Sequence, residues 1–256
     1  MNRTELLLDT LREAVVSRRV PGQDAVLLSG GLDSAIVAML AKGEGDIRAY
    51  TVGLGRSHDM DAGMACANEI GLPWGGIMIT REDVRLGISE LSRLLDTTDP
   101  VKLSYELPLF FACRGAEEEV LLCGQGADEL FGGYARYVDM APAERRAVMQ
   151  ADTARLLNEG IGGEGRIAAE FGKRIAYPYL DARVQHLASE LSDDLIIHDG
   201  ERKVALRQVA SALGLSAANK KKKAAQYGSG IMAEMKKMAR EARMPLGKYM
   251  ETLREG

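Results

Sequence analysis

Four short apolar segments, each followed by a helical pattern, constrain the fold of this chain more than any other feature. The expected strands occupy residues 24–29, 47–53, 74–80 and 119–123. Strands that alternate with helices through short loops are typical of βαβ units, in which the strands run parallel. We therefore predict an α/β fold built on a doubly wound parallel sheet.

The alternation stops near residue 140, and the remaining sequence has mainly helical patterns. We predict a nucleotide-binding α/β core over residues 1–140 and a helical extension over residues 141–256 that completes the active site. No linker rich in proline or serine separates the two parts, so one continuous domain is the alternative.

Composition excludes several classes of protein. A chain of 256 residues is long enough to bury a core without disulfides, and its net charge of −4 argues against a protein that coats nucleic acid or binds anionic membranes. Three cysteines without a C-x-x-C pair and three scattered histidines disfavour zinc and haem sites. We expect a reduced, cytoplasmic protein with no membrane partner and no signal peptide.

The loop Ser29-Gly-Gly-Leu-Asp-Ser34 joins the first strand to a helix. Its glycines permit close backbone approach, and the N–H groups at the helix start favour an anion. A carboxylate repels phosphate, so Asp33 is better explained as a ligand of the Mg²⁺ that accompanies a nucleotide. The alternative is a simple turn and helix cap. The loop lacks the lysine of a Walker A motif, which disfavours γ-phosphoryl transfer.

A second glycine-rich loop, over residues 123–134, follows the fourth strand. Ligands of open α/β sheets bind at the carboxyl ends of strands. Asp128 and Glu129 begin the next helix, where they would cap it or bind a metal. A third segment, over residues 160–165, fits G-x-G-x-x-G, but it follows a helix. We interpret it as a flexible loop between helices, not as a dinucleotide site.

These motifs together resemble a known family. SGGLDS resembles the PP-loop of the ATP pyrophosphatase superfamily, and CGQGADELFGGY resembles the S-G-E-G-S-D-E-x-F-G-G-Y segment of asparagine synthetases. Three later stretches, at residues 178–181, 203–207 and 222–230, resemble that family's P-F-L-D, K-x-x-L-R and K-x-Q-[FY]-x-x-G. The motifs occur in the family's order, so the chain resembles the synthetase domain of asparagine synthetases.

The resemblance implies an AMP-forming ligase that uses ATP and Mg²⁺. Its small-molecule substrate is an aspartate-like carboxylate, which is adenylated and then amidated by ammonia. Adenylation turns a poor leaving oxygen into a good one, and the site must stabilise the charge on phosphorus and pyrophosphate.

The resemblance also implies the residues of the site. The implied ATP and pyrophosphate contacts are Leu28, Ser29, Gly30, Gly31, Asp33, Ser34, Val52, Cys123 and Gly124. Asp33 and Asp128 are the implied Mg²⁺ ligands. Lys222 or Lys223 falls near the lysine that neutralises pyrophosphate, and the register does not choose between them. A solvated charge run is the alternative, favoured for Lys220 and Lys221.

The chain also departs from the family pattern. The family's catalytic glutamate is Gln125 here, and an amide cannot act as a carboxylate base. The family's E-x-R before P-F-L-D is Arg174-Ile-Ala176. The glutaminase domain has no counterpart, so we expect the chain to use free ammonia or a separate amidotransferase subunit.

Two other functions stay open at this stage. One is a PP-loop adenylating enzyme with a different acceptor, such as a tRNA base or a secondary metabolite, although nucleic acid is disfavoured by the net charge. The other is an ATP-binding subunit without catalysis. The oligomeric state is open, with a homodimer as one arrangement.

Overall fold

A five-stranded parallel sheet forms the centre of the protein, and a computed structural model describes residues 2–219 and 228–255. The strands are β1 (Asp24–Leu27), β2 (Arg48–Leu54), β3 (Trp74–Ile79), β4 (Val120–Leu122) and β5 (Arg174–Ala176). Their spatial order is β3-β2-β1-β4-β5, and all four neighbouring pairs are parallel. The predicted α/β class is confirmed.

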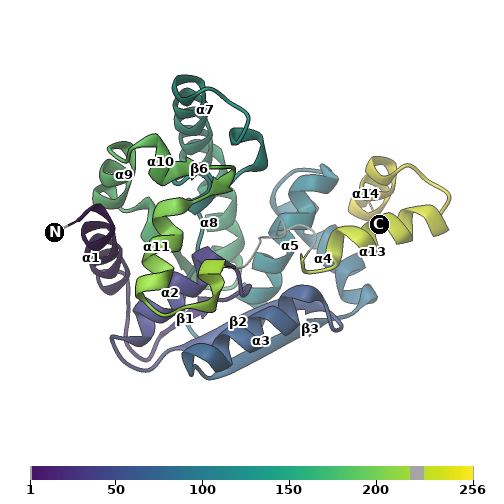
Figure 1. Ribbon diagram of the computed structural model, residues 1–256. Helices are drawn as coiled ribbons and strands as arrows, with labels where there is room; N and C mark the ends of the chain where they lie inside the picture. Colours follow the sequence, from purple (N-terminus) through teal and green to yellow (C-terminus); the bar gives the residue numbers. More distant parts are fainter. Residues whose placement is uncertain (1, 220–227, 256) are drawn as a thin grey trace.

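Helices cover both faces of this sheet, and each face has its own hydrophobic core. The first core includes side chains from α1 (Arg3–Val16), α2 (Leu32–Lys42), α3 (His58–Ile70), α9 (Ala182–Ser189) and α11 (Val204–Ala212). The second includes side chains from α4 (Arg81–Leu94), α5 (Pro100–Gly115), α8 (Ile161–Glu170), α13 (Ile231–Glu241) and α14 (Leu246–Glu255). In Figure 1, α13 and α14 lie beside α4 and α5, away from α1 and α9.

The remaining elements complete the chain between these helices. They are α6 (Ala127–Leu130), η1 (Ala135–Tyr137), α7 (Pro142–Arg155), the π-helix η2 (Leu156–Gly160), η3 (Pro178–Leu180), α10 (Asp193–Ile196), β6 (Ile197–His198), β7 (Glu201–Arg202) and η4 (Ser216–Asn219). The last two strands form a small antiparallel pair. Among the described helices, none is long and apolar enough to cross a membrane.

The strand β5 lies in the part of the chain that the sequence predicted to be helical. It has only three residues, too few for a strand pattern to stand out, and it pairs with β4 through Ile175 and Ala176. Both of these side chains are buried. Residues 141–256 therefore contribute a strand to the central sheet as well as helices.

The expected flexible loop at residues 160–165 is wrong, because the chain is helical without interruption from residue 142 to residue 170. The helix is maintained by packing on both sides of the glycines, where Leu156 and Ile167 are buried. A β-carbon added to Gly163 would lie 3.8 Å from Leu95, which is ordinary contact. Tertiary packing thus outweighs the poor helix propensity of four glycines.

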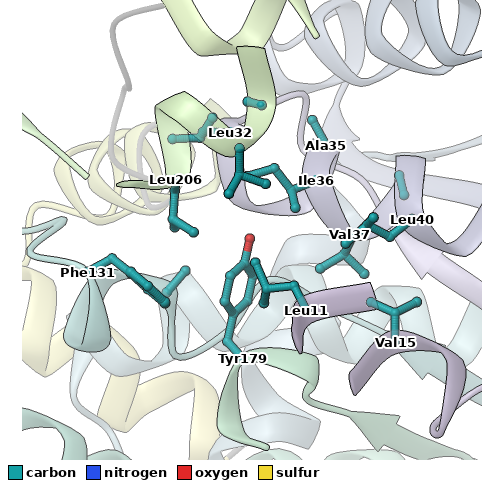
Figure 2. Packing of buried hydrophobic residues seen from close by; sticks show 14 of the residues in the cluster. Leu11, Val15, Leu32, Ala35, Ile36, Val37, Leu40, Phe131, Tyr179 and Leu206 are labelled. Carbon is teal, nitrogen blue, oxygen red and sulfur yellow. The ribbon is translucent and has the colours of Figure 1, made fainter. Parts of the chain in front are cut away.

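Tyr179 marks the core on the α1 side of the sheet, where its ring lies among Leu11, Phe131 and Leu206 (Figure 2). The ring is fully buried and meets the Phe131 ring edge to face, with 6.0 Å between centroids. Its hydroxyl donates a hydrogen bond of 3.2 Å to the carbonyl oxygen of Asp33. The P-Y-L-D motif therefore supports the loop that follows β1.

Candidate active site

The loop between β1 and α2 has the form of an anion cradle. Gly30 has a φ of +72°, and a β-carbon there would lie 2.5 Å from the backbone of Ala62 in α3. Only glycine fits this position. The Ser29 and Ser34 hydroxyl oxygens are 3.2 Å apart, and Gly31 is the N-cap of α2. The positive end of an eleven-residue helix thus faces the loop, as an anion site requires.

The loop after β4 lies directly against this cradle. A β-carbon on Gly124 would approach the β-carbon of Asp33 and the backbone nitrogen of Ser34 to 3.0 Å. The neighbouring Cys123 donates its N–H to the carbonyl oxygen of Ala176 in β5. The structure therefore brings together the two glycine-rich loops that the sequence singled out.

Two carboxylates from these loops converge on one ammonium group. The Nζ atom of Lys203 is 2.6 and 2.7 Å from the two oxygens of Asp33, and 2.7 Å from an oxygen of Asp128. The Lys203 side chain is 4% exposed, and the carboxylates are 13% and 23% exposed. A β-carbon on Gly133 would overlap Asp128 and the Lys203 side chain. This glycine makes room for the triad.

Lys203 is a site residue that was not among the candidates from the sequence. It begins the K-x-x-L-R motif, but that motif by itself does not reveal which residue it faces. Its backbone is left-handed, with a φ of +59°, directly before α11. Such a conformation is costly for a residue other than glycine and is found where the surroundings enforce it. Here the backbone directs the lysine toward Asp33 and Asp128.

The same donor set fits a magnesium ion bound together with phosphate. Mg²⁺ prefers oxygen ligands and is commonly held by one or two carboxylates and by the phosphates of its substrate. Asp33 and Asp128 already point at a common cation. The described residues contain no group of three or more metal-ligating side chains, so oxygens of the nucleotide would complete the coordination.

Leu28 and Val52, two of the implied ATP contacts at strand ends, face opposite sides of the sheet. Leu28 belongs to the core on the α1 side of the sheet, and Val52 belongs to the opposite core. Successive residues of a strand alternate between faces, and the β1–β2 register sets Leu28 and Val52 one step apart. Both lie toward the carboxyl ends of their strands, so the backbone there, and not a joint apolar surface, is what they could offer a base.

Asp181, in the P-Y-L-D motif, has a structural role. It accepts from the N–H of Arg183 at the start of α9 and forms ion pairs with Arg18 and Arg183. These bonds hold the pKa of Asp181 well below its usual range, with the Arg183 side chain as the main cause. The motif thus ties α1 to α9 behind the site.

Gln125 lies three residues before Asp128 and has a different kind of neighbour. Its Nε2 atom donates a hydrogen bond of 2.9 Å to Glu164 of α8. Burial raises the pKa of Glu164, and the Gln125 amide and the Tyr177 hydroxyl oppose that rise. Burial, reinforced by the charge of Glu164, raises the pKa of Glu106 to about 8. A buried carboxyl pair therefore adjoins the second loop.

Neither carboxylate was found from the sequence. Glu164 falls in the glycine-rich segment that the sequence predicted to be a flexible loop, and Glu106 lies within an otherwise ordinary helix, α5.

Cys123 was implied as a nucleotide contact. Burial raises the pKa of its thiol, so the thiol stays protonated and is unsuited to nucleophilic catalysis.

Lys222 and Lys223 lie outside the described residues, as do Lys220 and Lys221. The chain that follows them is anchored at the site's edge, because the N–H of Leu54 at the end of β2 donates to the carbonyl oxygen of Ser229 at 2.9 Å. A β-carbon on Gly228 would overlap the carboxylate of Asp59. The segment therefore returns to the carboxyl edge of the sheet.

Comparison with known proteins agrees with this arrangement of motifs. The family model described as asparagine synthase matches residues 4–158. This chain belongs to the asparagine synthase family. That match includes both glycine-rich loops and ends before β5 and Lys203.

Individual relatives are similar over larger parts of the chain. A protein of Methanocaldococcus jannaschii that carries the name asparagine synthetase 1 is 29% identical over 91% of this chain and 51% of its own length. The asparagine synthetase of Mus musculus is 26% identical over 81% of this chain and 39% of its own. The chain thus spans about half or less of these relatives, all of which are named as glutamine-hydrolysing. A solved NMN synthetase from Francisella tularensis aligns with a TM-score of 0.46, at 13% identity, over 99% of this chain and 92% of that one.

Proposed function

We infer that this chain catalyses the ATP-dependent adenylation of a carboxylate, with aspartate as the first candidate, and its amidation by ammonia. AMP and pyrophosphate are the other products. The observation that carries the proposal is the convergence of Asp33 and Asp128 on Lys203 beside a glycine cradle. Membership of the asparagine synthase family supports the same chemistry.

Different residues of the site would carry different parts of this reaction. The backbone N–H groups of the cradle would bind the β- and γ-phosphates, which leave as pyrophosphate. Asp33 and Asp128 would hold Mg²⁺, which draws charge from the leaving group. Lys203 would move its charge from the two carboxylates toward a phosphate once the metal takes its place. Lys222 or Lys223 remains the family's counterpart for the pyrophosphate-binding lysine.

Amide formation completes the reaction. The substrate carboxylate attacks the α-phosphate, which gives an acyl adenylate, and ammonia then displaces AMP from the acyl carbon. The source of ammonia is part of the proposal: ammonium in solution suffices for the chemistry, and a separate amidotransferase subunit is an alternative supply.

Aspartate-dependent exchange of labelled pyrophosphate into ATP tests the adenylation step directly. We expect the native chain to exchange with Mg²⁺ and aspartate, and to form asparagine and AMP when ammonium is added. Asp33→Asn should lower exchange by about a hundredfold or more, since charge stabilisation at the phosphates is lost. The matched control is Asp9→Asn on the exposed surface of α1. A native chain that forms AMP with no carboxylate would overturn the proposal.

A different acceptor carboxylate is a second candidate, favoured by the contact between Gln125 and Glu164. That contact puts an amide and a carboxylate where the family motif has a glutamate. A panel of amino acids and dicarboxylates, assayed for AMP release with and without ammonium, separates the candidates. Release with another carboxylate and none with aspartate would favour the second.

A further inference from the structure

The side-chain amide of Gln125 donates a hydrogen bond of 2.9 Å to Glu164. The carboxylate comes from α8, far along the chain from the loop of Gln125, and it is 6% exposed. The family's glutamate is Gln125 in this chain, and Glu164 of α8 brings a carboxylate within hydrogen-bonding distance of that side chain.

The titratable groups that interact with Glu164 come from several elements around it. α5 contributes Glu106 and Tyr105, the segment after β5 contributes Tyr177, and the second glycine-rich loop contributes Cys123, with Glu129 following in α6. Glu164 forms no salt bridge within residues 2–219 and 228–255. Its charge is stabilised by hydrogen bonds, not by a neighbouring cation.

One negative charge is shared unequally between the two carboxyl groups. Two adjacent carboxylates resist ionising together, and the group with the better hydrogen bond takes the charge. Glu164 accepts from Gln125, while the pKa of Glu106 is about 8 because of burial and the charge on Glu164. Glu106 therefore keeps its proton at neutral pH, and Glu164, whose charge raises the pKa of Glu106, is the first of the two to lose its proton. A buried carboxylate with a raised pKa is a stronger base than one in water.

We propose that Glu164, oriented by Gln125, accepts the proton from the amine that attacks the acyl adenylate. This role rests on the proposed function. The nitrogen forms its bond to the acyl carbon, the bond from that carbon to the AMP oxygen breaks, and AMP leaves with the electron pair. One proton passes from nitrogen to Glu164 and then to solvent. Gln125 acts as a positioning residue, because it holds the carboxylate and does not itself take the proton.

The pair explains why an amide occupies position 125. A glutamate there would bring a second carboxylate within about hydrogen-bonding distance of Glu164, and mutual repulsion would protonate one of them or separate both. Gln125 and Glu164 therefore form a matched set. The exchange of the two side chains, Gln125→Glu with Glu164→Gln, keeps one carboxylate and one amide in contact.

Three variants and two reactions test the role. The variants are Glu164→Gln, Gln125→Glu and their combination, and Glu170→Gln on the exposed end of α8 is the control. Pyrophosphate exchange with aspartate reports adenylation. Asparagine formation from ammonium, and hydroxamate formation from hydroxylamine, report attack on the adenylate. Hydroxylamine is a weaker base and a strong nucleophile, so it needs less help in losing its proton.

We expect Glu164→Gln to keep exchange within about threefold and to lose about a hundredfold of asparagine formation, the usual contribution of a general base. Hydroxamate formation should fall much less. At constant free ammonia, native asparagine formation should rise with pH as Glu164 deprotonates, and the variant should lack this rise. Gln125→Glu should also lower asparagine formation, and the combined variant should recover at least tenfold over Glu164→Gln.

Two results would overturn the proposal in distinguishable ways. Loss of exchange in Glu164→Gln, with native exchange intact, would place Glu164 in adenylation or in folding and end its role as the base. Absence of exchange in the native chain with aspartate and with every other carboxylate of the panel would end the proposed function and this role with it. A combined variant no better than either single change would also contradict the matched pair.

Discussion

The surroundings of Asp128 and of Gln125, both in the second glycine-rich loop, balance charge in opposite ways. At the Asp128 end, two carboxylates surround one lysine, and every charge has a partner at 2.6–2.7 Å. At the Gln125 end, the amide donates to Glu164 alone, the nearby Glu106 is also buried, and neither carboxyl group forms a salt bridge among the described residues. The first arrangement suits a site that must receive a polyanion with its metal. The second keeps Glu106 protonated at neutral pH, because its pKa is raised to about 8.

Under the proposed function, one short loop would serve two half-reactions. At Asp128, which we call the phosphate end, charge is balanced in advance, so Mg²⁺ would replace the Lys203 ammonium on binding. At Gln125, which we call the acceptor end, the buried carboxyl groups would gain or lose a proton with pH. The following changes separate the two ends, beginning with the largest expected effect.

Lys203→Met would remove the cation that Asp33 and Asp128 share. Two carboxylates would then face each other without a cation, and loss of one partner from a buried ion pair costs about 3–5 kcal/mol. We expect a large fall in the melting temperature, and exchange of pyrophosphate reduced about a hundredfold or more. Millimolar Mg²⁺ should raise the melting temperature of the variant more than that of the native chain.

The matched control for this change is Lys248→Met, at an exposed lysine paired with Glu251 on α14. It should alter neither stability nor the response to Mg²⁺ by a measurable amount, since exposed ion pairs contribute little. A Lys203→Met protein as stable as the native chain in the absence of Mg²⁺ would show that the carboxylates tolerate one another without a cation.

Glu106→Gln would remove the repulsion between the buried carboxyl groups of Glu106 and Glu164. The folded pKa of Glu106, about 8, is higher than its ordinary value of 4.5, so the folded state binds more protons between these two values. Native stability should therefore fall as pH rises from about 4.5 to 8, and the variant should lack that fall. We expect the variant to be more stable by on the order of 1–3 kcal/mol at pH 8.5, and similar to the native chain at pH 4.5.

Urea unfolding of both proteins across this pH range measures the effect. Glu117→Gln, beyond the end of α5 on an exposed residue, is the control. If the variant gains the same free energy of unfolding at pH 4.5 and at pH 8.5, the gain comes from packing and not from the ionisation of Glu106.

Tyr179→Phe should give the smallest effect of these changes. Tyr179 supports the loop that carries Asp33. It removes one hydroxyl bonded to the Asp33 carbonyl while the buried ring remains. A single hydrogen bond of this kind contributes about 0.5–1.5 kcal/mol. We expect a loss in that range by urea unfolding, with a modest rise in the KM for ATP. Tyr249→Phe on α14, away from this loop, serves for comparison.

How well the sequence predicted each region depended on the spacing of its parts. The cradle from Ser29 to Ser34 is contiguous, so its residues and its place after a strand were visible together. Asp128 could be paired with Asp33 only through a family resemblance, because the fold alone brings the two loops into contact. Lys203 belonged to a quoted motif, yet its direction depends on a left-handed backbone that no pattern in the sequence announces.

The carboxyl groups near Gln125 were harder to predict from the sequence, for a physical reason. Glu164 lies among four glycines whose local preference is against a helix, and only burial of Leu156 and Ile167 overrides that preference. Glu106 is one buried acid on a helix whose other buried residues are mostly apolar. A carboxylate of this type becomes visible only when the elements are packed, because its partner is distant in sequence. The strand β5 was missed for a similar reason, since three residues show no alternation.

That strand has a consequence for how the protein can be divided. β5 pairs along the whole of β4, so the sheet gains its fifth member only when residues 174–176 are present. The match to the family model ends at residue 158. A fragment cut at that boundary would expose β4 as an unprotected edge, with bare backbone groups open to intermolecular pairing. The end of the family-model match and the limit of autonomous folding are therefore different places in this chain, and a self-sufficient unit must extend beyond the first of them.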